Sequence, residues 1–115
     1  TLSPDKIDLT TLYIQPSTTL QNFSGLTAGK WFVTIFVQGQ TSGGRGYVGA
    51  QIYQNGTFAK INYQTSDQAN DWLSASCSYI TTISAGETLG VKAETSSATL
   101  HNESRRSGAY AIKIG

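Results

Sequence analysis

Three consecutive residues, Asn70-Asp71-Trp72, place an indole ring beside an amide and a carboxylate. An indole can stack on the apolar face of a pyranose while amide and carboxylate groups hydrogen-bond its hydroxyls. Asp67 lies in the same polar segment, residues 65–71. The expected sugar-binding site therefore consists of Asp67, Asn70, Asp71 and Trp72. Two alternatives stay open for Trp72, because its ring can also cap the end of the core or pack in a subunit contact.

A second polar segment, residues 95–107, contains the other candidate ligand-binding residues, His101, Arg105 and Arg106. Two adjacent guanidinium groups can hold an anionic group such as a phosphate or a sugar acid. The alternative interpretation is a solvated arginine pair beside a surface histidine. Both segments have the composition of loops, and loops on a rigid β scaffold often carry recognition.

The residues that catalysis would need do not form a recognisable set. His101 is the sole histidine and no serine lies in a nucleophile elbow, so a Ser-His-Asp triad is not expected. Cys77 falls on the apolar side of an alternating segment, where a thiol acts as a small hydrophobe. Asp67 and Asp71 could ligate calcium, but two carboxylates in a polar loop are usually solvated. We therefore predict a non-enzymatic protein with no metal or other cofactor.

Composition limits the class of partner. The 115 residues carry a net charge of +1 and only 13% charged residues, which favours neither nucleic acid nor an anionic membrane as a partner. No apolar run is long enough to cross a bilayer, so membrane insertion is not expected. The chain contains no methionine, and we expect it to be a fragment or a processed product.

The elements that position these residues are expected to be β-strands. Asn55-Gly56 is typical of the two-residue loop of a type I′ hairpin. With Gln54 opposite Thr57, the register pairs Ile52 with Ala59 and places every aliphatic residue of both strands on one face. The same register pairs Tyr53 with Phe58 on the other face, as a cross-strand clasp, a receptor platform or part of a subunit contact.

Other alternating segments complete an antiparallel β-sandwich or jelly roll. Residues 72–84 place Leu73 and Cys77 on a core face and Trp72 with several serines on the opposite face. Further strands are expected at residues 89–93 and 108–114, with a short edge strand within residues 17–23. Residues 1–16 are interpreted as a lead-in from an upstream segment, and residues 17–115 as the domain.

Residues 31–37, WFVTIFV, are unusual because both faces of the expected strand are apolar. A sheet in a small domain normally buries one face and wets the other. Either residues 17–23 or the long loops fold over the second face, or other copies of the chain cover it. A bare apolar face of this kind is an aggregation hazard.

The order of these motifs resembles the tumour necrosis factor and complement globular-head jelly rolls. The motifs are Ala28-Gly29-Lys30-Trp31-Phe32-Val33, Asn55-Gly56, Ala85-Gly86-Glu87 and Ser107-Gly108-Ala109-Tyr110. The resemblance covers residues 17–115 and implies a jelly roll that assembles as a homotrimer through its inner sheets. Such an assembly accounts for the second apolar face of residues 31–37.

Separately, Ser3-Pro4-Asp5-Lys6-Ile7-Asp8-Leu9 resembles a phrase that precedes the terminal domain of phage tail and baseplate fibre proteins. The two resemblances together imply a trimeric receptor-binding head on the virion, joined to upstream fibre or baseplate segments and attached to a host cell-surface saccharide. Three weak sites on one particle gain avidity. The alternatives are a structural module that trimerises and caps a fibre, and a secreted complement-type head with a protein ligand.

Overall fold

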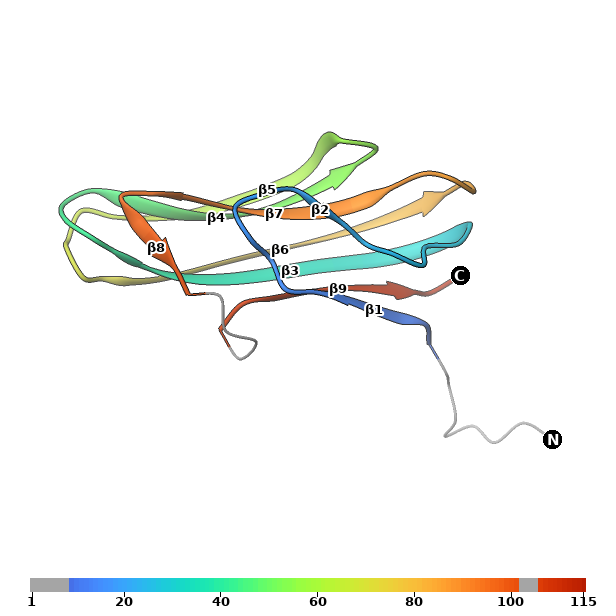
Figure 1. Cartoon of the computed structure of the whole chain (residues 1–115), viewed down its shortest axis with the longest axis horizontal. Coiled ribbons are helices and arrows are strands. Elements are labelled where there is room, and N and C mark those ends of the chain that lie inside the picture. Colours follow the sequence, from blue (N-terminus) through green and yellow to red (C-terminus); the bar gives the residue numbers. More distant parts are fainter. Residues whose placement is uncertain (1–8, 102–105) are drawn as a thin grey trace.

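The computed structural model describes residues 9–101 and 106–115, and these residues form nine β-strands in two packed sheets (Figure 1). The strands are β1 (Thr11–Ile14), β2 (Gln21–Asn22), β3 (Gly29–Thr41), β4 (Gly46–Gln54), β5 (Thr57–Ser66), β6 (Trp72–Ile83), β7 (Leu89–Ser96), β8 (Ala98–Leu100) and β9 (Gly108–Lys113). Neighbouring strands pair antiparallel, so the predicted all-β antiparallel sandwich is confirmed.

The strand order is that of a jelly roll. Sheet A runs β1-β9-β3-β6, with β8 paired to the far end of β3, and sheet B runs β2-β7-β4-β5. Most successive strands along the chain therefore belong to opposite sheets, which closes one core between the two layers. Figure 1 shows the connections β3–β4, β5–β6 and β7–β8 gathered at one end of the sandwich, on the left of the view.

The core follows the period of two that the sequence predicts. Trp31, Val33, Ile35 and Val37 of β3 are buried, and they meet Val48, Ala50 and Ile52 of β4 from the other sheet. Burying one such aliphatic side chain stabilises the fold by about 1.5–3 kcal/mol. The Trp31 Nε1–H donates to the Thr27 carbonyl over 2.8 Å, which satisfies the one polar atom of the indole.

Cys77 lies in the core as predicted. Its Sγ donates to the Ala50 carbonyl over 3.4 Å, and burial raises its pKa to about 11. A neutral thiol at physiological pH packs as a small apolar group.

The predicted hairpin forms, but its register is wrong beyond the turn. Asn55 and Gly56 have φ of 54° and 76°, as a type I′ turn requires, and Tyr53 pairs with Phe58 as expected. A bulge then follows at Ala59, so that Ile52 pairs with Lys60 instead of Ala59. The extra residue turns Ile61 to the outer face of sheet B, so its predicted place with the aliphatic residues of the core face is wrong, and Tyr63 lies on the same outer face.

The domain begins earlier than residue 17. Residues Thr11–Ile14 form β1, which pairs with β9 along its whole length, so these residues belong to sheet A and not to a lead-in. The predicted edge strand within residues 17–23 is present as β2 in sheet B. The phrase at residues 3–9 lies outside the described residues except for Leu9.

The second face of β3 lies on the outside of sheet A. Phe32, Thr34 and Phe36 are half-buried there, and Ile80 of β6, opposite Phe32, is 54% exposed. The Phe36 and Tyr110 rings stack with centroids 6.4 Å apart. The expectation that residues 17–23 cover this face is wrong for Gln21 and Asn22, because these residues pair with β7 in the opposite sheet.

Candidate functional site

Trp72 and the turn before it lie at the end of the sandwich where β3–β4, β5–β6 and β7–β8 connect (Figure 1), and His101, which follows β8, contacts Trp72 there. Backbone hydrogen bonds tie these connections together: the Thr41 N–H donates to the Asp71 carbonyl and the Ser42 N–H to the Ser97 carbonyl, each over 2.9 Å. The connections at this end of the sandwich, which we call the loop end, are therefore linked by backbone hydrogen bonds and can hold side chains in fixed positions.

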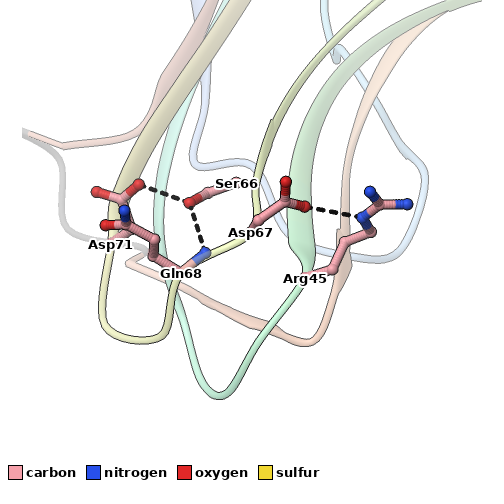
Figure 2. A network of polar contacts seen from close by, with 5 residues as sticks. All are labelled: Arg45, Ser66, Asp67, Gln68 and Asp71. Atoms are coloured by element: carbon pink, nitrogen blue, oxygen red, sulfur yellow. Dashed lines mark hydrogen bonds and ion pairs between the residues drawn. The ribbon is translucent and has the colours of Figure 1, made fainter.

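The two aspartates of the first segment are engaged in this bracing, as Figure 2 shows. Asp67 Oδ1 accepts from Arg45 Nε over 2.9 Å, an exposed ion pair that raises the pKa of Arg45. Asp71 Oδ2 accepts from Ser66 Oγ over 2.6 Å, and the same hydroxyl accepts from the Gln68 N–H over 3.1 Å. Both carboxylates thus stabilise the β5–β6 connection, which leads directly into Trp72.

Asn70 contributes to the same connection through its backbone. Its φ of 58° is in the left-handed region, which asparagine tolerates better than most residues. The Asn70 N–H donates to the Thr41 carbonyl over 2.9 Å, and the Asn70 carbonyl accepts from Gln40 Nε2 over 3.3 Å. Asn70 therefore shapes the turn that sets the position of Trp72.

Trp72 makes its ring contacts with the other candidate segment. The His101 ring lies 4.4 Å from the indole, centroid to centroid, and Arg106 Cζ lies 4.8 Å from its centroid. An arginine over an indole contributes about 0.5–1 kcal/mol at an exposed site. We call Trp72, His101 and Arg106 the Trp72 cluster. The indole stays 43% exposed, so the cluster presents a surface to solvent.

Hydrogen bonds around buried Ser107 hold the cluster together. Ser107 Oγ donates to the His101 carbonyl over 2.7 Å and accepts from the Gln38 N–H over 3.1 Å. Arg106 Nη1 donates to Gln38 Oε1 over 3.2 Å, which fixes the guanidinium beside the indole. The predicted sites did not include Gln38 or Ser107, and no residue pattern in the sequence marks them.

A groove of about 330 Å³ adjoins the cluster on the outer face of sheet A. It is lined by Phe36, Val37, Gln38, Ser74, Ala75, Ser76 and Arg106. Serine hydroxyls, an amide and a guanidinium can hydrogen-bond a polyol or an anion, and Phe36 offers an apolar wall. The groove and the exposed apolar side chains of sheet A share one face of the molecule.

The structure thus joins Trp72, His101 and Arg106 in one cluster, and places Asp67, Asn70 and Asp71 in the turn before it. Arg105 lies outside the described residues. Within the described ranges, no group of three histidine, cysteine or acidic side chains is arranged to hold a metal ion. Among the same residues, no helix is long and apolar enough to cross a membrane.

Comparisons with known proteins are informative for the fold. No protein-family model matches the sequence, and no curated protein matches it. Among solved structures, the Eiger TNF of S. frugiperda superposes with a TM-score of 0.64 at 13% identity. The match covers 82% of this chain but only 64% of that one, so this chain spans less than two thirds of its length. The protein is an antiparallel two-sheet sandwich with the TNF-like jelly-roll fold.

Proposed function

We propose that this protein is a non-enzymatic, homotrimeric receptor-binding head that attaches to a saccharide on a cell surface. The observation that carries the proposal is the Trp72 cluster, in which an exposed indole, an imidazole and a guanidinium from separate segments meet at a braced loop end. Such a set suits a ligand with an apolar face and polar or anionic substituents, as sugars and sugar acids have.

The outer face of sheet A supports the trimeric state. Phe36, Tyr110 and Tyr13 form a chain of ring contacts across β3, β9 and β1, and Ile80 on β6 is a further exposed apolar side chain, opposite Phe32. Exposed aromatic and aliphatic side chains on one sheet face are typical of a surface that another subunit covers. Three copies also give avidity to a weak saccharide site.

The phage context of the proposal rests on the residue phrase from Ser3 to Leu9 alone. In this context the head stands at the tip of a tail fibre or baseplate appendage of the virion, and the saccharide belongs to the bacterial host. Upstream fibre or baseplate segments precede the domain.

A second candidate function is a structural module that trimerises and caps a fibre. The observation in its favour is the direction of Trp72, which shares the outer face of sheet A with Ser74, Ser76 and Ile80. A subunit packed on that face can cover the indole as well. The Trp72 cluster then stabilises the assembly and does not meet a ligand.

Substitution of Trp72 by alanine separates the two functions. For a saccharide site we expect Trp72→Ala to weaken binding to purified cell-wall glycans by about 1–3 kcal/mol while the assembly and its melting temperature stay unchanged. Phe58→Ala, which removes an exposed ring from the other sheet and the other end, is the matched control. Loss of assembly before any loss of binding contradicts the receptor site and favours the capping module.

A further inference from the structure

We propose that the outer face of sheet B carries a binding site for a neutral hexopyranose, with the Tyr63 ring as its floor and the Tyr47 ring as its wall. The site is a second one, apart from the Trp72 cluster, and it rests on the proposed function, since that function makes the ligand a saccharide and places the Phe36, Tyr110 and Tyr13 rings of sheet A in the subunit contact. Sheet B then faces outward in the assembly and remains open to a ligand.

The position of the Tyr63 ring is set by a glycine. Tyr63 on β5 pairs with Gly49 on β4, and Gly49 pairs in turn with Glu94 on β7. A Cβ added at Gly49 would lie 2.4 Å from two ring carbons of Tyr63, so the ring lies directly on the glycine backbone. The missing side chain lets the ring cross β4 and reach β7.

Hydrogen bonds fix the far end of the ring. The Tyr63 hydroxyl donates to Glu94 Oε2 and accepts from Gln51 Nε2, and Gln51 Nε2 also donates to Glu94 Oε2 over 2.7 Å. Gln51 is only 2% exposed, and its Oε1 accepts from the Tyr53 hydroxyl over 2.9 Å. The ring is thus held at both ends before any ligand arrives, and this lowers the entropic cost of binding.

The exposed side of the Tyr63 ring lines a groove. Tyr63 is 44% exposed, and the Tyr47 ring stands against it at 85° with centroids 5.2 Å apart. Tyr47, Tyr63 and Thr65 line a groove of about 340 Å³. This volume is near the lower limit of small-molecule sites, about 300–1,000 Å³, so the groove suits one ring-sized group.

The chemistry of the groove selects a neutral sugar. Its walls are mainly aromatic and match the apolar face of a sugar ring, and Tyr47 and Thr65 carry hydroxyls that can bond the ring's substituents, whereas the Tyr63 hydroxyl is engaged with Glu94 and Gln51. No charged side chain lines the groove. The Glu94 carboxylate, which accepts hydrogen bonds from Gln51 and from the lining residue Tyr63, disfavours an anionic sugar. Lys92, paired with Gln51 on the same face, disfavours a cation.

The test is a titration of the intact protein with methyl β-D-glucopyranoside and methyl β-D-galactopyranoside, followed by NMR of the tyrosine ring signals. We expect the Tyr47 and Tyr63 signals to shift on addition of one or both hexosides. Tyr63→Ala, which removes an exposed side chain, and Gly49→Ala, which lifts the ring, should each weaken binding about tenfold or more. Phe58→Ala, an exposed aromatic on the same sheet but outside the groove, should bind normally.

Three results would overturn the site. The first is that neither hexoside shifts the Tyr63 signals of the wild-type protein. The second is that choline shifts them and the hexosides do not, which identifies a cation site. The third is that hexoside binding survives Tyr63→Ala in a folded protein and is lost in Trp72→Ala. This third outcome rejects the sheet B site but not the proposed function. If the protein binds no cell-wall glycan at all, a saccharide ligand is rejected both for the sheet B site and for the proposed function.

Discussion

In both sheets alternate residues point to the outer face, but the side chains on the two outer faces make different contacts. On sheet A, the Phe36 and Tyr110 rings stack on each other, Ile80 lies opposite Phe32, and all of these side chains remain half-buried or exposed. On sheet B, the rings of Tyr53 and Tyr63 are tied by hydrogen bonds to Gln51. An apolar face gains free energy only when another surface covers it, whereas a hydrogen-bonded face is complete in contact with water. This difference is the reason why the proposed subunit contact is placed on sheet A and the proposed sugar site on sheet B, although sheet B also exposes Phe58 and Ile61.

A matched pair of isoleucine substitutions tests whether the two outer faces differ in this way, and it has the largest expected effect. Ile80 on sheet A is 54% exposed and Ile61 on sheet B is 39% exposed, so neither residue is needed for the core. We expect Ile80→Asp to weaken trimer formation by more than about 2 kcal/mol, because it places a charge in an apolar contact. Ile61→Asp should leave the trimer intact. Equal effects of the two substitutions in sedimentation experiments would remove the distinction between the faces.

A second prediction concerns the hairpin that carries sheet B. Gly56 has φ of 76°, which a β-branched residue resists, so Gly56→Val should lower the free energy of unfolding by about 1–3 kcal/mol. Gly43→Val is the control, since Gly43 has no positive φ and a Cβ there meets no atom within 4 Å. Chemical denaturation of both variants provides the measurement, and an unchanged Gly56→Val protein contradicts the type I′ turn.

A third prediction concerns the core between the sheets. Because burial raises the pKa of Cys77 to about 11, only about one thiol in a thousand is ionised at pH 8. We expect a thiol-specific reagent to leave the folded protein unmodified for hours and to react within minutes in denaturant. Rapid modification of the folded chain shows that the two sheets separate readily, and the core between them is then less tightly closed than described.

The smallest expected effect lies at the end of the sandwich opposite the loops. Glu87 accepts from the Ser84 N–H over 2.6 Å and from Asn55 Nδ2 over 2.7 Å, and these bonds lower its pKa below the ordinary value of 4.5. The carboxylate therefore stabilises the fold above pH 4.5, and this contribution is lost as the pH falls through the lowered pKa. Glu87→Gln should remove a small part of the acid sensitivity of the melting temperature. An identical pH profile for the variant means that these bonds contribute nothing.

Alternation predicted much of the fold. In residues 31–37 and 72–77 buried residues alternate with more exposed ones, because each strand has one face in the core. The bulge at Ala59 could not be predicted, since the alternation of apolar residues is also compatible with a regular register through the hairpin. β1 has only four residues and gains its stability from pairing with β9, which local sequence does not reveal.

The candidate site was predicted in part. Its aromatic, basic and acidic residues were identified by type, but Trp72 was assigned acidic neighbours because they adjoin it in sequence. In the structure those carboxylates accept hydrogen bonds from Arg45 and Ser66 and stabilise the β5–β6 connection, and the Trp72 ring contacts His101 and Arg106. Contacts between segments far apart in sequence depend on the strand order, which the residue pattern alone does not determine.

The proposed homotrimeric assembly is tested most directly by the mass of the wild-type protein in solution. Sedimentation equilibrium at micromolar concentration and physiological salt should give a mass three times that of one chain, with no change when salt is raised, because the contact is apolar. A monomer under the same conditions contradicts the account. The exposed face of sheet A would then have no subunit to cover it, and the trimeric receptor-binding head would have to be abandoned.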